Sequence, residues 1–417
     1  MSAVLEQERV VSFPVWYELR REEARAEFEK LAWPTRKDEN WRFGRIKEAD
    51  LSGAQVVHGG VVGQLPEPAI EGALRFVFWN NELVATEGEV PAGVIAGPLA
   101  DVLRDHGDAL EAVMPPLQGK LGSGKLAAMH RAQSEGGMAL VLEGHLDRPV
   151  EIVHVVSGEG ATVLPYLFLV AKRGAKGSVV ERFVNASEGE EVTVVSVSDV
   201  VMGEETQVKY LVSQELNAGS RMIRLADSKL GRHAAGKVGT LQTGARWSRE
   251  EVYSTVEGAE GNSEILSVAI PDTGQEYDQR TFQHHGAPHT GSDLLFKNTL
   301  FGKGKTIFSG LIFVDEGAHY TDAYQTCRNL LMSDEAEATS MPGLEINADQ
   351  VKCSHGSTSA RVSDEEIYYL CSRGIDPVMA RRMIAQGFSA EVVEKLEDER
   401  LEEFALGQIA GKFSRVS

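Results

Sequence analysis

The run Val351–Thr358 places a thiol and an imidazole two positions apart, at Cys353 and His355. If this run is an extended strand, its period of two directs Cys353 and His355 to one face and Lys352 and Ser354 to the other. Thiolate and neutral imidazole are both ligands of zinc and iron. This pair is therefore the strongest candidate in the chain for metal chemistry.

Two ligands do not complete a metal site. A four-coordinate metal or an iron–sulfur cluster usually needs about four protein ligands, mostly thiolates. The chain has three cysteines in total, Cys327, Cys353 and Cys371. Two interpretations stay open: a second chain supplies the missing ligands, or Cys353 is a packing thiol and His355 hydrogen-bonds to the backbone.

A second group of candidate residues comprises His284, His285 and His289, with Asp278 close by in sequence. These residue types suggest a metal-dependent hydrolase or lyase built on a β-solenoid as an alternative function. No His-Glu-x-x-His helix accompanies them, and the stretch Gly119–Lys125 lacks the Ser or Thr that a phosphate-binding loop carries after its lysine. We therefore expect no ATP binding by this chain.

The composition excludes several classes of partner. A chain of 417 residues suggests two or three structural units or one elongated solenoid. The net charge of −20 repels phosphate backbones and anionic lipids, so we expect neither nucleic acid nor a membrane as a partner. Three cysteines argue against a disulfide framework, and acidic Glu6 and Glu8 argue against a secretory signal. The sequence thus predicts a cytoplasmic protein.

Helices are expected near the N-terminus and strands in the middle of the chain. Helix-forming composition spans residues 16–33 and 99–114, and each stretch ends at a proline. From Met138 the chain consists of short runs rich in Val, Ile and Thr, separated by Gly, Asn and Asp, with no convincing helix for nearly 200 residues. A sandwich, a barrel or a β-solenoid would fit this pattern, and no strict repeat chooses among them.

Helical signals return near the C-terminus. Ser363 is a predicted N-cap, and the helix that follows should end at Gly374. A second helix is expected to start at Pro377 and end at Gly387, and a third to start at Ser389. The apolar face of these helices could pack on the strand region or bind a partner groove.

Four segments of the C-terminal half resemble the SufB/SufD family of iron–sulfur cluster assembly proteins. They are TDAYQTCRNLLMS (321–333), MPGLEI (341–346), KCSHG (352–356) and EEIYYLCSRGI (365–375). The KCSHG form and the Ser-Arg-Gly-Ile ending are similar to the SufD branch, as is the chain length. The match is dense over roughly residues 275–390, and Glu39–Phe43 resembles a family signature near the N-terminus.

The resemblance implies a mainly β fold: a right-handed parallel β-helix core with N-terminal and C-terminal helical units. Applied to this sequence, it divides the chain into an N-terminal mixed and helical unit (1–137), the β-helix (138–360) and a C-terminal helical unit (361–417).

The resemblance also implies a function. It predicts a non-enzymatic scaffold subunit that pairs with a SufB-like paralogue and binds the ABC-type ATPase SufC through residues 361–405, with a homodimer possible when partners are absent. His355, and second Cys353, are the candidate ligands of a transient iron or iron–sulfur cluster shared with SufB. No cofactor should then bind stably to the chain alone.

Overall fold

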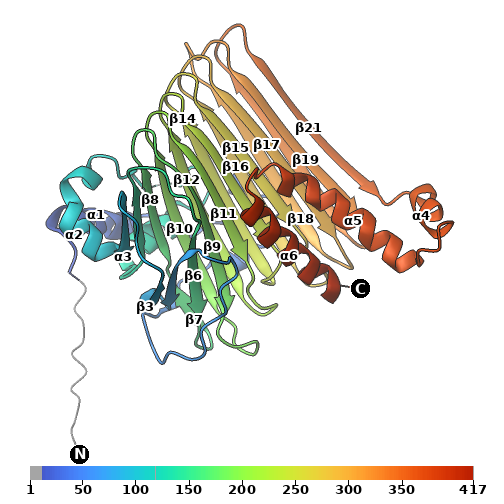
Figure 1. Cartoon of the computed structure of the whole chain (residues 1–417), viewed down its shortest axis with the longest axis horizontal. Helices are drawn as coiled ribbons and strands as arrows, with labels where there is room; N and C mark the ends of the chain where they lie inside the picture. The colour runs from blue at the N-terminus through green and yellow to red at the C-terminus, as the bar shows by residue number, and fades with distance from the viewer. Residues whose placement is uncertain (1–11, 118, 417) are drawn as a thin grey trace, which may run out of the picture.

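The chain winds through two β-sheets that face each other, and each turn contributes one strand to each sheet (Figure 1). The pairing is parallel except at the first edge of each sheet, where the outermost strand pairs antiparallel with its neighbour. This computed structural model describes residues 12–117 and 119–416; Glu6 and Glu8 lie outside them. About eight turns form a β-solenoid with helices at both ends of the chain. The predicted fold, mainly β with a parallel β-helix core and terminal helical units, is confirmed at this level.

The first sheet contains nine strands in a continuous path, with two short strands, β1 and β7, beside it. In chain order its members are β1 (Gln55–Val56), β4 (Val94–Pro98), β5 (Met138–Leu142), β7 (Ala161–Val163), β8 (Tyr166–Ala171), β10 (Thr193–Met202), β12 (Arg221–Leu230), β14 (Trp247–Val256), β16 (Glu276–His285), β18 (Lys305–Val314) and β20 (Glu337–Ile346).

The second sheet has ten strands and ends at β21. Its members are β2 (Leu74–Trp79), β3 (Glu82–Glu87), β6 (Val150–Val156), β9 (Lys176–Asn185), β11 (Gln207–Gln214), β13 (Ala235–Gln242), β15 (Asn262–Ala269), β17 (Gly291–Leu300), β19 (Asp322–Leu331) and β21 (Lys352–Arg361). Strands β2 to β4 come from the first 137 residues, so this part of the chain starts both sheets.

A repeat exists in the structure, although its length varies. From Met138 onward, register partners in neighbouring turns are 26 to 32 residues apart, the extremes being Arg221 with Trp247 and Lys305 with Glu337. One corner of successive turns carries a non-glycine residue with positive φ. These corner residues are Glu205, His233, Glu260, His289, Tyr320 and Gln350. The N–H groups of the first four bond to the next turn, as from His233 to the carbonyl of Ala259 at 3.1 Å.

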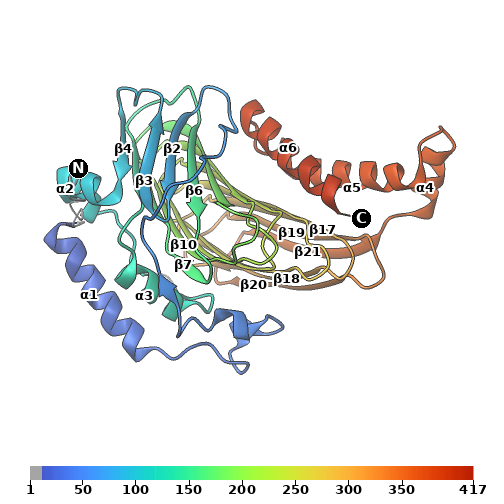
Figure 2. The same ribbon diagram turned by 90° about the horizontal axis from the view of Figure 1, so that it is seen from below.

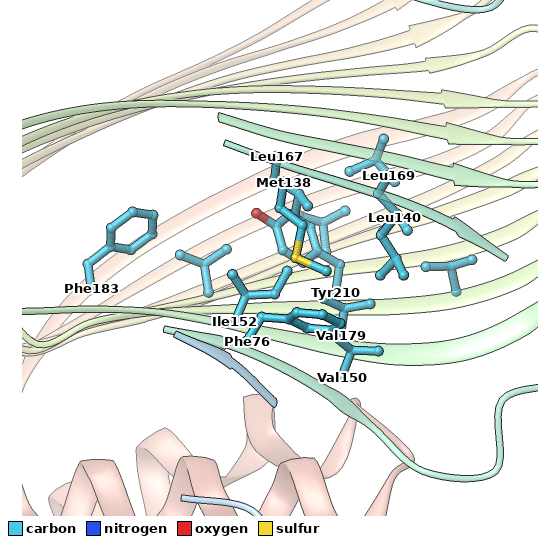
Figure 3. Packing of buried hydrophobic residues seen from close by; sticks show 14 of the residues in the cluster. Phe76, Met138, Leu140, Val150, Ile152, Leu167, Leu169, Val179, Phe183 and Tyr210 are labelled. Atoms are coloured by element: carbon cyan, nitrogen blue, oxygen red, sulfur yellow. The ribbon is translucent and has the colours of Figure 1, made fainter. Parts of the chain in front are cut away.

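The solenoid interior changes from apolar to polar along its axis. The early turns enclose a buried cluster that includes Phe76, Leu140, Ile152 and Leu169 (Figure 3). The later turns direct buried amide and hydroxyl side chains inward instead; they include Gln279, Gln283, Ser292, Asn298, Gln325 and Asn329. Burial of apolar side chains contributes about 25 cal/mol per Å², so the early turns gain more from the hydrophobic effect than the late ones.

Three N-terminal helices cover the outer face of the first sheet, and the two long C-terminal helices cover the second (Figure 2). The N-terminal helices are α1 (Val15–Lys30), α2 (Leu99–Glu111) and α3 (Gly124–Gln133). The two helices predicted over 16–33 and 99–114 are thus confirmed as α1 and α2. Helix α3, which packs between α1 and β10, was not predicted from the residue pattern. None of the helices within residues 12–117 and 119–416 combines the length and apolar character needed to span a bilayer.

The C-terminal helices are α4 (Asp364–Cys371), α5 (Pro377–Glu394) and α6 (Glu399–Arg415). The predicted N-cap is confirmed, because the Ser363 hydroxyl accepts a hydrogen bond from the N–H of Glu365 at 3.2 Å. The predicted boundary at Gly387 and Ser389 is wrong: α5 continues through both residues, and α6 starts after its N-cap, Asp398. Ser389 is buried and donates to the carbonyl of Ala385, inside the helix.

A buried arginine joins the N-terminal segment to the solenoid. Arg249, on the outer face of β14, contacts Glu251 at 2.7 Å and Asp278 on β16. Its guanidinium also donates to the carbonyl of Asn40 at 3.0 Å and lies 3.7 Å from the centre of the Trp41 ring. Trp41 belongs to the short 3-10 helix Glu39–Trp41; a second spans Ile46–Ala49. This network fixes residues far apart in sequence against one sheet.

Candidate functional site

The solenoid ends with one uncovered turn, made of β20 and β21. Each of these ten-residue strands lies at the end of its sheet, so one long edge of each is free among the described residues. The N–H of Lys352 donates inward along the sheet, to the carbonyl of Thr321 at 2.8 Å. Because successive N–H groups of a strand point to opposite edges, those of Cys353 and His355 point to the free edge.

Cys353 is half-buried and faces into the last turn. It packs against the apolar cluster that includes Ile312, Val314 and Leu344. Burial raises the pKa of the Cys353 thiol above its ordinary value, and a nearby backbone hydrogen bond from Ala323 partly opposes this. The thiol form is therefore favoured in the free chain, which suits packing; ligation would require the proton to leave.

His355 is exposed on the same face of β21. The predicted extended run is confirmed, and with it the shared orientation of Cys353 and His355. Their role as ligands stays a prediction. Among the described residues no group of three or more His, Cys, Asp or Glu side chains is placed to hold a metal.

The other two cysteines lie elsewhere. Cys327 is fully buried inside β19, where burial raises the pKa of its thiol to about 11. Cys371 is at the end of α4. Neither belongs to the apolar cluster that packs around Cys353.

The structure separates the three histidines of the alternative site. His284 is directed outward to Asp315, with 2.7 Å between Nε2 and Oδ2. His285 is buried, and His289 stacks on Tyr320 at a corner, with 4.7 Å between ring centres. The nearby Asp278 is buried in the Arg249 network. The geometry therefore gives the hydrolase or lyase alternative no common site.

Both ring nitrogens of His285 lie within hydrogen-bonding distance of hydroxyl groups, with Nδ1 2.8 Å from Thr290 Oγ1 and Nε2 2.8 Å from Ser292 Oγ. Burial lowers the pKa of His285 to about 4 from its ordinary value of 6.5. The folded state thus holds the ring neutral, while the unfolded chain protonates it near pH 6.5. The stability that depends on this ring is complete above pH 6.5 and is lost as the pH falls toward 4.

We therefore expect the wild-type chain to lose stability between pH 7 and 4.5, with this ring contributing roughly 2–3 kcal/mol. His285→Gln should show a pH-dependent loss smaller by that amount in urea unfolding at the two pH values. An unchanged pH dependence in His285→Gln would contradict the assignment.

One residue beside the candidate ligands could not be identified from the sequence alone. Gln325 is the register partner of His355 in β19, and both project from the same face. The two residues are 30 positions apart, so their proximity is visible only once the length of this turn is known. Their closeness in space was not apparent from any local pattern.

Comparison with known proteins agrees with this architecture. Residues 154–388, more than half of the chain, match the family model described as "SUF system FeS cluster assembly, SufBD core domain". The matched region covers the solenoid from β6 onward and reaches into α5.

Individual relatives extend over most of the chain. The iron–sulfur cluster assembly protein SufD of Escherichia coli is 30% identical over 399 residues, which cover 90% of this chain and 88% of that protein. A SufBD family protein of Synechocystis is 25% identical, with 88% and 84% covered. SufD of Bacillus subtilis is 26% identical, with 73% and 70% covered. The chain therefore belongs to the SufBD family of the SUF iron–sulfur cluster assembly system, with a SufD-like sequence.

Proposed function

We propose that this protein is a non-enzymatic scaffold subunit that pairs with a SufB-like paralogue through the free edges of β20 and β21. In this proposal His355, and second Cys353, are ligands of a transient iron ion or iron–sulfur cluster held between the two subunits. The cluster is the product under assembly rather than a resident group of this chain.

The uncovered last turn is the observation that carries the proposal. Natural sheets usually shorten, charge or cover an edge strand, because a long free edge pairs readily with another chain. Here two ten-residue edges lie side by side at one end of the molecule. A strand added to β21 would bond to the backbone of Cys353 and His355, which would bring its own side chains next to both candidate ligands.

The shortage of ligands favours a paralogue over a second identical copy. Two copies of this chain would offer two imidazoles and two thiols whose pKa values are raised by burial. A paralogue can instead contribute side chains that this chain lacks at the junction.

Coexpression tests the pairing directly. The tagged chain should copurify with a SufB-like protein and an ABC-type ATPase of the SufC kind, and elute with them as one species in size exclusion. The variant Ser357→Glu, on the free edge of β21, should lose the SufB-like protein and keep its own fold. Recovery of the chain as a monomer or homodimer in the presence of both partners would overturn the proposal.

We further propose that residues 361–405, which contain α4, α5 and the first turns of α6, bind the SufC-like ATPase. Helix α4 has no buried residue and projects away from the solenoid (Figure 1). Together α4 and α5 expose several large apolar side chains: Tyr368, Tyr369, Val378, Met379 and Met383. A SufC-like partner that buries these side chains would gain most from the largest of them.

Met379→Asp should weaken binding of the SufC-like ATPase by at least about tenfold, the loss typical of a buried interface residue. Binding can be measured by calorimetry with the purified ATPase. Leu406→Asp, at an equally exposed apolar position just beyond residue 405, is the matched control and should bind normally. Equal affinities for the two variants would place the ATPase elsewhere.

A further inference from the structure

The side-chain amide of Gln325 is buried without a hydrogen-bond partner. The residue is 1% exposed, and neither Nε2 nor Oε1 has a partner among the described residues. A buried polar group left unpaired costs about 1–3 kcal/mol, so native proteins rarely keep one without a reason.

The Gln325 amide occupies space that is left open by a glycine on the facing sheet. The amide extends across the solenoid interior to Gly310 on β18, where a Cβ atom would lie 1.7 Å from Gln325 Nε2. The same point lies 2.6 Å from the hydroxyl oxygen of Thr281, which is also buried without a partner. Any residue larger than glycine at position 310 would displace the amide.

Polar side chains in these same strands already bond along the solenoid axis. Asn298 on β17 donates to Asn329 on β19 at 2.8 Å, and Asn329 donates to Ser359 on β21 at 3.1 Å. These three residues are in register, as Gln325 and His355 are four positions earlier in β19 and β21. Neighbouring strands in a sheet lie about 4.8 Å apart, a distance that such side chains bridge with one hydrogen bond.

We infer that Gln325 is a positioning residue for His355: its amide hydrogen-bonds one imidazole nitrogen and leaves the other free for iron. The inference rests on the proposed function of His355 and deepens it. Neither amide atom has a partner among the described residues of the chain alone. In the complex, Gln325 Oε1 would accept the imidazole N–H, and the Thr281 hydroxyl would accept from the amide N–H.

This arrangement addresses a requirement of ligation. A neutral imidazole carries a single N–H, and the nitrogen that binds metal must be the other one. A hydrogen-bond acceptor at the N–H fixes both the tautomer and the ring orientation. Water can serve this role while His355 is exposed, but a subunit docked on β21 would displace that water. Gln325 then offers an acceptor from inside the same sheet.

Three variants test the inference in the full chain. Gln325→Met removes the amide at nearly constant volume, and Gly310→Ala displaces it while leaving Gln325 in place. Gln279→Met is the matched control, because Gln279 is an equally buried inward amide with an unpartnered Oε1, and it lies on β16, away from β21. The nitrogen-15 shifts of the His355 ring, assigned with His355→Ala, report its tautomer at a pH where the ring is neutral.

In the complex with the SufB-like partner docked on β21, we expect Gln325→Met and Gly310→Ala to move the His355 ring shifts toward those of a short peptide spanning 352–356, and Gln279→Met to leave them unchanged. In the complex with the SufB-like and SufC-like partners, iron affinity should fall about 10–100-fold in the first two variants, with subunit association intact. Unchanged ring shifts in Gln325→Met would overturn the inference. Normal cluster assembly by His355→Ala would instead overturn the proposed function, and the ring shifts would still decide the role of Gln325.

Discussion

Replacing His355 with Ala should abolish cluster production by the assembled complex while leaving the complex itself intact. Loss of an outer hydrogen-bonding partner alone costs about 10–100-fold in metal affinity, so loss of a ligand should cost at least 100-fold. The exposed side chain of His355 makes no contribution to the core, so the fold should survive. Iron and sulfide content after reconstitution of the coexpressed complex measures the effect.

Ser354→Ala is the matched control for this experiment, because Ser354 lies on the same strand and faces the opposite side. It should assemble clusters at the wild-type rate. Wild-type iron and sulfide content in His355→Ala would remove this residue from the mechanism.

Cys353 can be separated from His355 by a change that keeps its packing. Cys353→Val fills a similar volume against Ile312, Val314 and Leu344 but cannot ligate iron. Loss of cluster production in this variant would assign the thiol a role as a ligand. Normal production would leave it as a packing residue, as its raised pKa suggests.

Replacing Arg249 with Ala should destabilise the protein by about 3–5 kcal/mol, the typical cost of removing one partner from a buried ion pair. The change would leave the buried Glu251 carboxylate without its guanidinium partner and Asp278 with Arg280 alone, and would remove the contact with the Trp41 ring. Because this network joins the N-terminal segment to β14 and β16, that segment should detach first. Thermal unfolding and limited proteolysis of residues 39–49 measure the effect.

Arg221→Ala provides the comparison for Arg249. Arg221 also links the N-terminal segment to the sheet, through Glu48 at 3.4 Å, but its side chain is partly exposed. Partly exposed ion pairs contribute about 0–1 kcal/mol, so this variant should unfold close to the wild type. Equal losses in the two variants would show that burial of Arg249 is not what stabilises the junction.

The sequence allowed prediction of features whose signals are local. The extended run at 351–358, the cap at Ser363 and the Pro377 helix start all depend on neighbouring residues, and the structure confirms each of them. The helix boundary at Gly387 failed because tertiary packing overrode a local preference. Glycine inside a helix costs about 1 kcal/mol, and α5 offsets this by burying Ala385, Val392 and Val393 against the second sheet.

Features that depend on the solenoid repeat could not be predicted from residue patterns. The corner positions are occupied by Glu, His, Glu, His, Tyr and Gln, which share a left-handed backbone but no side-chain chemistry. Turns of unequal length further conceal the period. The resemblance to the SufB/SufD family, not periodicity, led to the correct architecture. Because the period is concealed, the sequence also did not show that Gln325 lies beside His355. The proposed boundaries at 137 and 360 stay predictions.

The gradient from an apolar to a polar interior has a consequence for how the molecule assembles. In a solenoid each repeat contacts only its neighbours, so folding nucleates where the local core is strongest and then propagates. The early turns should form first, and β20 and β21 should join last and exchange their amide hydrogens fastest. Terminal repeats of solenoids normally need a capping repeat. A docked subunit would act as that missing cap, so maturation of this chain and recruitment of its partner would become one event.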